Sequence, residues 1–172
     1  MNLPLGYRYA ATYAGIRHEE RDDLALIVSG MPAAAAAVFT QNRVQAAPVK
    51  LCRRNLRASR SRVGAILVNA GNANCATRTG DRVAVASCRC VAKHLKLPPA
   101  EVLVASTGVI GVELDYALID KALPKLIASL GEDRFHDVSH AIMTTDLVAK
   151  EAFGEVKLRR GTVRIAGMTK GS

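Results

Sequence analysis

Short apolar runs that stop at glycine or asparagine dominate the hydrophobic pattern of this chain. The runs at 23–29, 64–69 and 102–105 are rich in aliphatic residues, which is typical of buried strands. Residues 33–40 hold five alanines before Val-Phe-Thr and lie between two turn-forming stretches. Alanine propensity favours a helix there, but the short length favours a second strand of a tightly packed sheet. The pattern therefore predicts four strands, with a turn at 30–32.

We predict four helices; in the second and third of them, apolar residues recur every three or four positions. The first covers residues 49–56, and the second begins after Gly80 and stops before Pro98. The third and fourth cover 115–130 and 135–143. Within the third helix, Pro124 predicts a kink or a division into two short helices, because proline lacks the N–H that a helix interior needs. Gly131 is a candidate C-terminal cap for the same helix.

The last predicted element is a β-hairpin, with strands at 150–158 and 162–168 joined at 159–161. Strands and helices follow one another in a mixed order, and no internal repeat or low-complexity linker interrupts them. A chain of 172 residues is long enough for one well-buried core. We therefore predict a single α/β (α+β) domain over residues 1–172, a sandwich of mixed β-sheets flanked by helices rather than a Rossmann fold.

The net charge of the chain excludes few classes of function. Lysine and arginine outnumber aspartate and glutamate by 24 to 15, and a net charge of +9 attracts anions in general. The densest basic stretch, 53–62, has no interleaved aromatic residues, so a solvated helix face is favoured over a nucleic-acid site. The first residues lack the pattern of a signal peptide, and no apolar run is long enough to cross a bilayer. We expect a cytoplasmic protein that binds neither nucleic acid nor membrane.

Cysteine and histidine give no metal-binding pattern. No cysteine pair has Cys-x-x-Cys spacing, which favours free thiols in a reducing compartment. The four histidines also lack the spacing of metal ligands. These residues are Cys52, Cys75, Cys88, Cys90, His18, His94, His136 and His140. We therefore expect no metal ion.

Small polar residues follow two of the predicted buried strands. After the strand at 102–105 come Ser106, Thr107 and Gly108. A glycine lets backbone N–H groups approach a ligand and threonine adds a hydroxyl donor, which suits them to stabilise an oxyanion. A strand-to-helix turn with a Ser or Thr cap explains the same residues. Spacing alone leaves both interpretations open.

The strand at 64–69 runs into a second polar stretch, in which carboxamides alternate around a glycine. Asn69, Asn72 and Asn74 could orient a zwitterionic substrate or simply form a turn. Residues 144–146 are similarly either a substrate clamp or a helix terminus. The final Lys-Gly-Ser is not a phosphate-binding loop, because Ile165 stands where that motif needs glycine.

Taken together, six stretches resemble, in the correct order, the ornithine acetyltransferase family, the bifunctional glutamate N-acetyltransferases of arginine biosynthesis. Each stretch alone is a weak signal, but the six cover nearly the whole chain. They are 23–27, 32–49, 68–74, 106–111, 141–146 and 170–172. The resemblance implies the self-cleaving fold that this family shares with related aminopeptidases.

The resemblance also implies a reaction and a set of site residues. Family members cut themselves before a threonine, and the resulting α and β chains stay together, commonly as α2β2. The new N-terminal threonine of the β chain takes an acetyl group from N-acetylornithine and passes it to glutamate. Thr107 and Gly108 match the family's oxyanion-hole pair, and Thr144 and Lys170 match substrate-binding positions. The resemblance implies no metal and no tightly held cofactor, and it leaves acetyl-CoA open as a second acetyl donor.

The chain departs from the family pattern at its end. The family continues past Lys-Gly-Ser to the cleavage motif, whereas this sequence stops at Ser172, and Thr169 is an unexpected residue. We therefore expect an α chain whose nucleophile lies on a β-chain partner. A longer chain that has been trimmed, or a truncated relative of the family, would give the same sequence as such an α chain. Two other functions stay open: a related self-cleaving amide hydrolase of the aminopeptidase type, and a non-catalytic basic binding domain.

Overall fold

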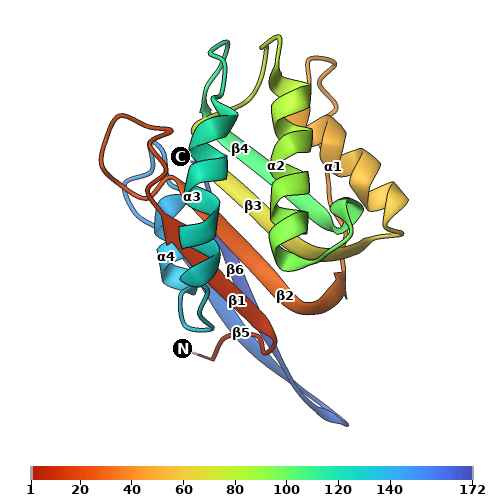
Figure 1. Cartoon of the computed structure of the whole chain (residues 1–172). Helices are drawn as coiled ribbons and strands as arrows, with labels where there is room; N and C mark the ends of the chain where they lie inside the picture. Colours follow the sequence, from red (N-terminus) through yellow and green to blue (C-terminus); the bar gives the residue numbers. More distant parts are fainter. Residues whose placement is uncertain (1, 172) are drawn as a thin grey trace.

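Four strands form a mixed sheet at the centre of the fold (Figure 1). The structure is a computed structural model that describes residues 2–171. Neighbours β1–β2 and β2–β3 are antiparallel, and β3–β4 are parallel and joined through a helical crossover. In their order across the sheet, the strands are β1 (Tyr7–Thr12), β2 (Leu24–Ala34), β3 (Arg62–Asn72) and β4 (Val102–Val109). This confirms the predicted mixed sheet and excludes the mostly parallel order of a Rossmann fold.

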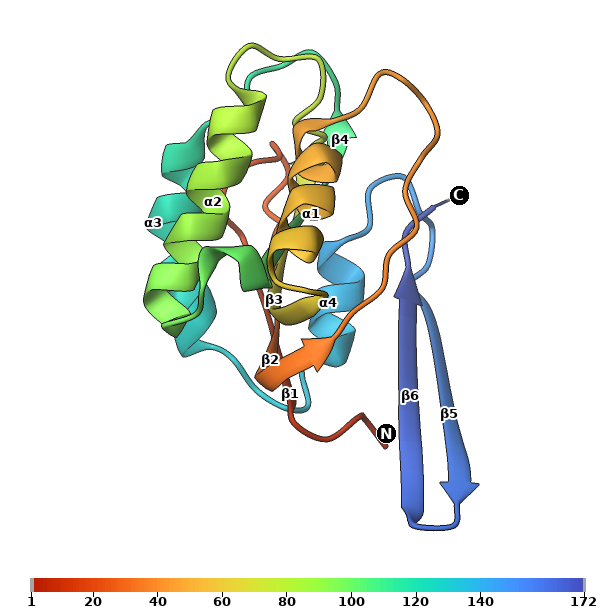
Figure 2. The same ribbon diagram turned by 90° about the vertical axis from the view of Figure 1, so that its right-hand side faces the viewer.

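Helices and a hairpin cover the two faces of this sheet (Figure 2). Three helices lie on one face, and a short fourth helix and the hairpin lie on the other. On the first face are α1 (Ala47–Ala58), α2 (Gly80–Leu95) and α3 (Tyr116–Ala128), and a single 3-10 turn, η1 (Pro99–Glu101), precedes β4. On the second face are α4 (Phe135–Ala141) and the hairpin strands β5 (Lys150–Leu158) and β6 (Gly161–Thr169). The predicted helices and the hairpin are thereby confirmed as elements.

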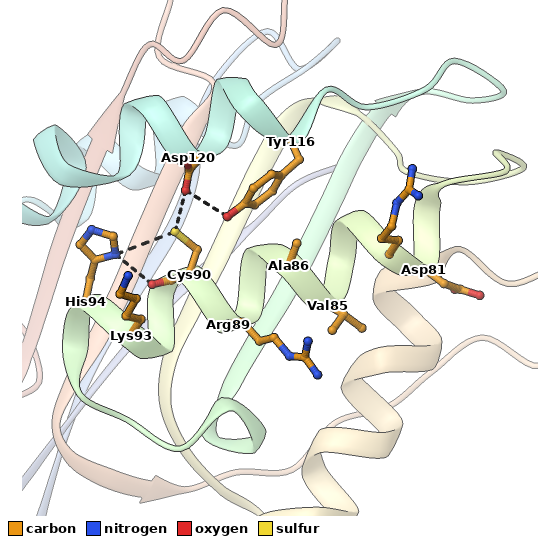
Figure 3. A pocket seen from close by; sticks show the side chains of 10 residues that line it. Asp81, Val85, Ala86, Arg89, Cys90, Lys93, His94, Tyr116 and Asp120 are labelled. Atoms are coloured by element: carbon orange, nitrogen blue, oxygen red, sulfur yellow. Dashed lines mark hydrogen bonds between the residues drawn. The ribbon is translucent and has the colours of Figure 1, made fainter.

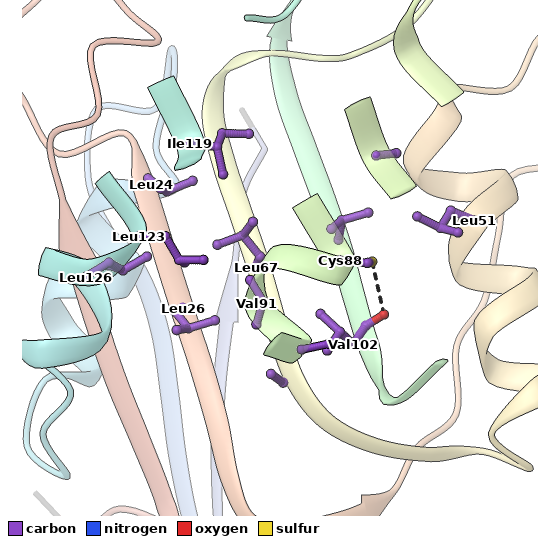
Figure 4. Packing of buried hydrophobic residues seen from close by; sticks show 14 of the residues in the cluster. Leu24, Leu26, Leu51, Leu67, Cys88, Val91, Val102, Ile119, Leu123 and Leu126 are labelled. Carbon is purple, nitrogen blue, oxygen red and sulfur yellow. Dashed lines mark hydrogen bonds between the residues drawn. The ribbon is translucent and has the colours of Figure 1, made fainter. Parts of the chain in front are cut away.

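Alternation along β2 explains why its first five residues, Leu24–Val28, are all apolar. Leu24 and Leu26 point into the larger core beneath α1, α2 and α3 (Figure 4). Ala25 and Ile27 pack into the smaller core beneath α4 and the hairpin. A strand that is covered on both faces buries both sets of side chains, so it reads as a continuous apolar run.

The boundary predicted in the first half of the chain is wrong. β2 does not turn at 30–32 but continues to Ala34, and no separate strand covers 33–40. Its pairing with β3 shifts register between Val28 and Ala33, so a bulge absorbs the glycine and proline that indicated a turn. Strand β1 was not predicted at all.

For the third helix, the division into two short helices and the cap at Gly131 are wrong, and the kink at Pro124 stays a prediction. α3 runs unbroken from Tyr116 to Ala128 with Pro124 inside it, so it is not two short helices. Pro124 and Asp120, whose carbonyl loses its helical partner, are both exposed, so water can hydrogen-bond that carbonyl. Ser129 rather than Gly131 caps the helix. Gly131 instead exchanges two backbone hydrogen bonds with Tyr9 of β1.

Within residues 2–171, no helix is both long enough and apolar enough to cross a membrane.

Candidate active site

The two small polar stretches lie side by side at the ends of β3 and β4. β4 continues past Ala105 to Val109, so Ser106, Thr107 and Gly108 are part of a strand and not of the predicted turn. They pair in parallel register, with Ala70 opposite Thr107 and Gly71 opposite Gly108. Residues that looked like turn formers therefore extend a strand, because β3 offers them backbone partners.

Glycine at the end of β4 is required by the close approach of the neighbouring backbone. Gly108 has φ +134°, and a Cβ placed there would lie 2.3 Å from the carbonyl carbon and oxygen of Gly71. A Cβ on Gly71 would in turn lie 2.8 Å from the Ile16 Cγ2 atom. Three segments of backbone thus meet at a point where no side chain fits.

The three asparagines of this region bind the protein itself. Asn69 donates to Ser106 Oγ at 2.7 Å and accepts from the N–H of Asn72. Asn72 accepts from the N–H of Asn74 at 2.7 Å, and Asn74 donates to the carbonyl of Gly80. All three side chains are buried. Of the two interpretations, the structure supports the one in which these carboxamides shape the loop.

One cavity brings the predicted site residues together. Thr107 and Gly108 of β4, Thr144 after α4 and Lys170 after β6 all line a cavity of about 550 Å³. The Thr107 hydroxyl makes no hydrogen bond to another described residue, and Gly108 is exposed. A hydroxyl and a backbone glycine thus face the space in which a substrate could lie.

Asp146 joins the two chain segments that bring Thr144 and Lys170 to this cavity. Its carboxylate accepts hydrogen bonds from Lys150 Nζ at 2.8 Å, from the N–H of Gly171 at 3.0 Å and from the N–H of Thr144 at 3.4 Å. The Lys150 hydrogen bond, then that from Gly171, lowers the pKa of Asp146 well below its ordinary value. The segment that carries Thr144 is thereby held to the segment that carries Lys170.

Sequence reasoning missed one wall of the cavity, which is formed by the segment between β1 and β2. Arg17, His18, Glu19 and Arg21 lie along it. The exposed pair Arg21 and Glu19 is 3.9 Å apart, which is too loose to contribute much stability. No motif marks this segment, although the buried Asp23 directly before β2 is a signal that could have indicated an ordered loop.

A larger cavity of about 680 Å³ lies between α2 and α3 and contains none of the predicted site residues (Figure 3). There, Cys90 Sγ and Tyr116 Oη donate to Asp120 Oδ1 at 3.1 and 3.0 Å. Burial raises the pKa of the Cys90 thiol, which keeps it protonated and weakly nucleophilic. Although this cavity is larger, the cavity lined by Thr107 and Thr144 is therefore the better candidate for an active site.

Comparison with known proteins relates nearly the whole chain to one family. The ArgJ family pattern matches residues 8–172. The arginine biosynthesis bifunctional protein ArgJ of Nitratidesulfovibrio vulgaris is 49% identical over 173 residues, which is 98% of this chain and 43% of that protein. The chain spans about two fifths of the length of the curated relatives it matches.

Two solved structures superpose closely on the whole chain. The arginine biosynthesis bifunctional protein ArgJ of Bacillus halodurans has a TM-score of 0.91 at 33% identity, covering 98% of this chain and 88% of that one. The ornithine acetyltransferase of Mycobacterium tuberculosis, complexed with ornithine, has a TM-score of 0.89 at 33% identity, covering 98% and 90%. By sequence and by fold, this chain belongs to the ArgJ family.

Proposed function

We propose that this chain is the α-chain part of an acetyltransferase of arginine biosynthesis that moves an acetyl group from N-acetylornithine to glutamate. The observation that carries the proposal is the single cavity lined by Thr107, Gly108, Thr144 and Lys170. Membership of the ArgJ family and the fold shared with an ornithine acetyltransferase support it.

In the proposed reaction, the N-terminal threonine of a β chain supplies the nucleophile and its own amine acts as the base. Its hydroxyl attacks the acetyl carbonyl and loses a proton to the amine, and the carbonyl oxygen becomes an oxyanion. The Thr107 hydroxyl and the Gly108 N–H donate to that oxygen. Collapse expels ornithine, which takes up the proton and leaves an acetyl ester on the threonine. The neutral amine of glutamate then attacks the ester carbonyl and gives a proton to the threonine amine. The ester C–O bond breaks, the threonine oxygen takes up that proton, and N-acetylglutamate leaves the regenerated enzyme.

Thr144 and Lys170 have the proposed task of holding the amino-acid part of both substrates. Ornithine and glutamate share an α-carboxylate, and a lysine ammonium is a suitable point charge for it. The Asp146 contacts with Gly171 and Thr144 support this pairing, because they keep the two binding residues on one side of the cavity. The scheme uses no metal and no bound cofactor.

The proposed form is a single α-chain domain assembled with a β chain, as α2β2. Apolar side chains on the hairpin support a partner surface, because soluble monomers rarely expose large apolar patches. Phe153, Val156, Leu158, Val163 and Ile165 are 42–59% exposed.

The test is acetyl transfer by this chain coexpressed with a second chain that begins at the family's cleavage-site threonine. The assembled enzyme should transfer acetyl from N-acetylornithine to glutamate, and Thr107→Ala should lower kcat about 100-fold because one oxyanion donor is lost. Thr107→Ser keeps the hydroxyl and is the matched control. A parallel assay with acetyl-CoA measures the second donor.

Three results would contradict the proposal. Unchanged kcat in Thr107→Ala would remove this residue from the oxyanion hole. Hydrolysis of small peptide amides without acetyl transfer would favour an aminopeptidase-like enzyme. Tight, strongly salt-dependent binding of nucleic acid in place of catalysis would favour a basic binding domain.

A further inference from the structure

The segment between β1 and β2 has a path that one buried carboxylate determines. Asp23 is fully buried and accepts backbone hydrogen bonds from Ala14 at 2.7 Å, Ile16 at 2.7 Å and Arg17 at 3.0 Å. Hydrogen bonds to an ionised group are stronger than neutral ones, and three of them compensate the desolvation of this carboxylate. The backbone of Arg17 is therefore held in place independently of its side chain.

The Arg17 side chain joins two parts of the chain that are far apart in sequence. Its Nε donates to the carbonyl of Ala70 at 2.6 Å, and its Nη2 donates to the carbonyl of Met143 at 2.6 Å and to that of Ala141 at 3.4 Å. Ala70 lies at the end of β3, and Met143 and Ala141 lie at the end of α4. One planar guanidinium thus connects them with fixed geometry.

Both tied carbonyls lie next to residues of the proposed active site. Ala70 is the register partner of Thr107 in the β3–β4 pair. Met143 directly precedes Thr144, and both Thr107 and Thr144 line the cavity. Arg17 therefore stands between the oxyanion side and the substrate side of one cavity.

We propose that Arg17 is a positioning residue, which sets the placement of the Thr107–Gly108 donors relative to Thr144 by holding the carbonyls of Ala70 and Met143. This inference rests on the proposed function. Donors to an oxyanion act only in the transition state, so their displacement lowers kcat more than it raises KM. If the Arg17 cation instead bound the substrate directly, its removal would mainly raise KM.

The experiment compares Arg17→Met and Arg17→Lys in the assembled enzyme. Arg17→Met should lower kcat about 10- to 100-fold, in line with the cost of small misplacements in active sites. KM should change by less than about threefold, because ground-state binding is retained. Arg17→Lys should give an intermediate kcat, since one ammonium lacks the planar fork that serves both carbonyls.

Arg53 provides a matched control. It also donates to a carbonyl, that of Thr40 at 3.0 Å, and its guanidinium lies 5.1 Å from the centre of the Phe39 ring, but it does not line the cavity. Arg53→Met should leave kcat and KM unchanged. If Arg17→Met raises KM at unchanged kcat, or behaves like Arg53→Met, the proposal is wrong.

Amide hydrogen exchange separates this inference from the proposed function. If the unmutated assembly transfers no acetyl group, the proposed function fails, and exchange then tests Arg17 by itself. Arg17→Met should speed exchange at 70–73 and 141–145 and leave α2 unchanged, and Arg17→Lys serves if the methionine variant does not fold. Uniformly faster exchange would mean a merely structural role, and unchanged exchange would mean no coupling; either result overturns the proposal.

Discussion

Among single residues, a glycine without a side chain is as important to the site as the residues that carry polar groups. Gly108 is the example: its positive φ disfavours any Cβ, and the carbonyl of Gly71 occupies the space that a Cβ would need. Neighbouring backbone can approach only because the side chain is missing. The fold therefore requires glycine at position 108.

We expect Gly108→Ala to destabilise the chain by about 2–6 kcal/mol, the sum of roughly 1–3 kcal/mol of backbone strain and about 1–3 kcal/mol of overpacking. Gly154 in β5 is the control, because a Cβ there would meet nothing within 4 Å. Urea unfolding of both alanine variants measures the difference. Equal stability of the two variants would show that the strands separate easily at Gly108.

At the scale of elements, the segment that follows α4 and the end of β6 are joined through Asp146. Its carboxylate has three hydrogen-bond donors, and the side chain is nearly inaccessible to water. The folded protein therefore favours the ionised form, which is why the pKa lies below its ordinary value. We therefore expect the junction between these two segments to weaken in acid.

Stability should consequently depend on Asp146 in acid. Because the folded pKa is lowered, the contribution is complete above the ordinary value of about 4 and is lost as the pH falls from there toward the folded pKa. Asp146→Asn should flatten the fall in the free energy of unfolding below about pH 4, and the exposed Glu20→Gln should not. Urea titrations between neutral and acid pH provide the measurement, and identical pH profiles for the two variants would contradict the assignment.

At the scale of the whole molecule, the hairpin differs from every other layer. β5 and β6 pair only with each other, and most of their apolar side chains remain exposed. The main sheet, in contrast, is covered on both faces. Exposed apolar strands without further strand neighbours are typical of surfaces that a partner covers.

Replacing Val156 and Val163, which are paired across the hairpin, with threonine should weaken assembly with the β chain and leave the unfolding of this chain nearly unchanged. Threonine is close in shape to valine but adds a polar group to the surface. Val38→Thr, at a fully exposed position outside any strand, is the control. Sedimentation of the coexpressed chains measures assembly, and equal assembly by all variants would place the interface elsewhere.

Local sequence patterns were enough to locate most of the helices and strands. Apolar runs indicated β2, β3 and β4, the stripe along α2 indicated a helix, and the spacing around 159–161 indicated the hairpin, because each of these signals lies within a few neighbouring residues. The family resemblance also indicated Thr107, Gly108, Thr144 and Lys170 before any geometry was known.

How those segments pair and pack became clear from the three-dimensional structure. It extended β2 past Gly30 and β4 past Ala105, added β1, and brought the segment around Arg17 to the wall of the cavity. Local propensity marked several of these residues as turns, but the backbone partners that override it come from elsewhere in the chain. Pairing and close backbone approach depend on contacts between distant residues, and no local pattern records them.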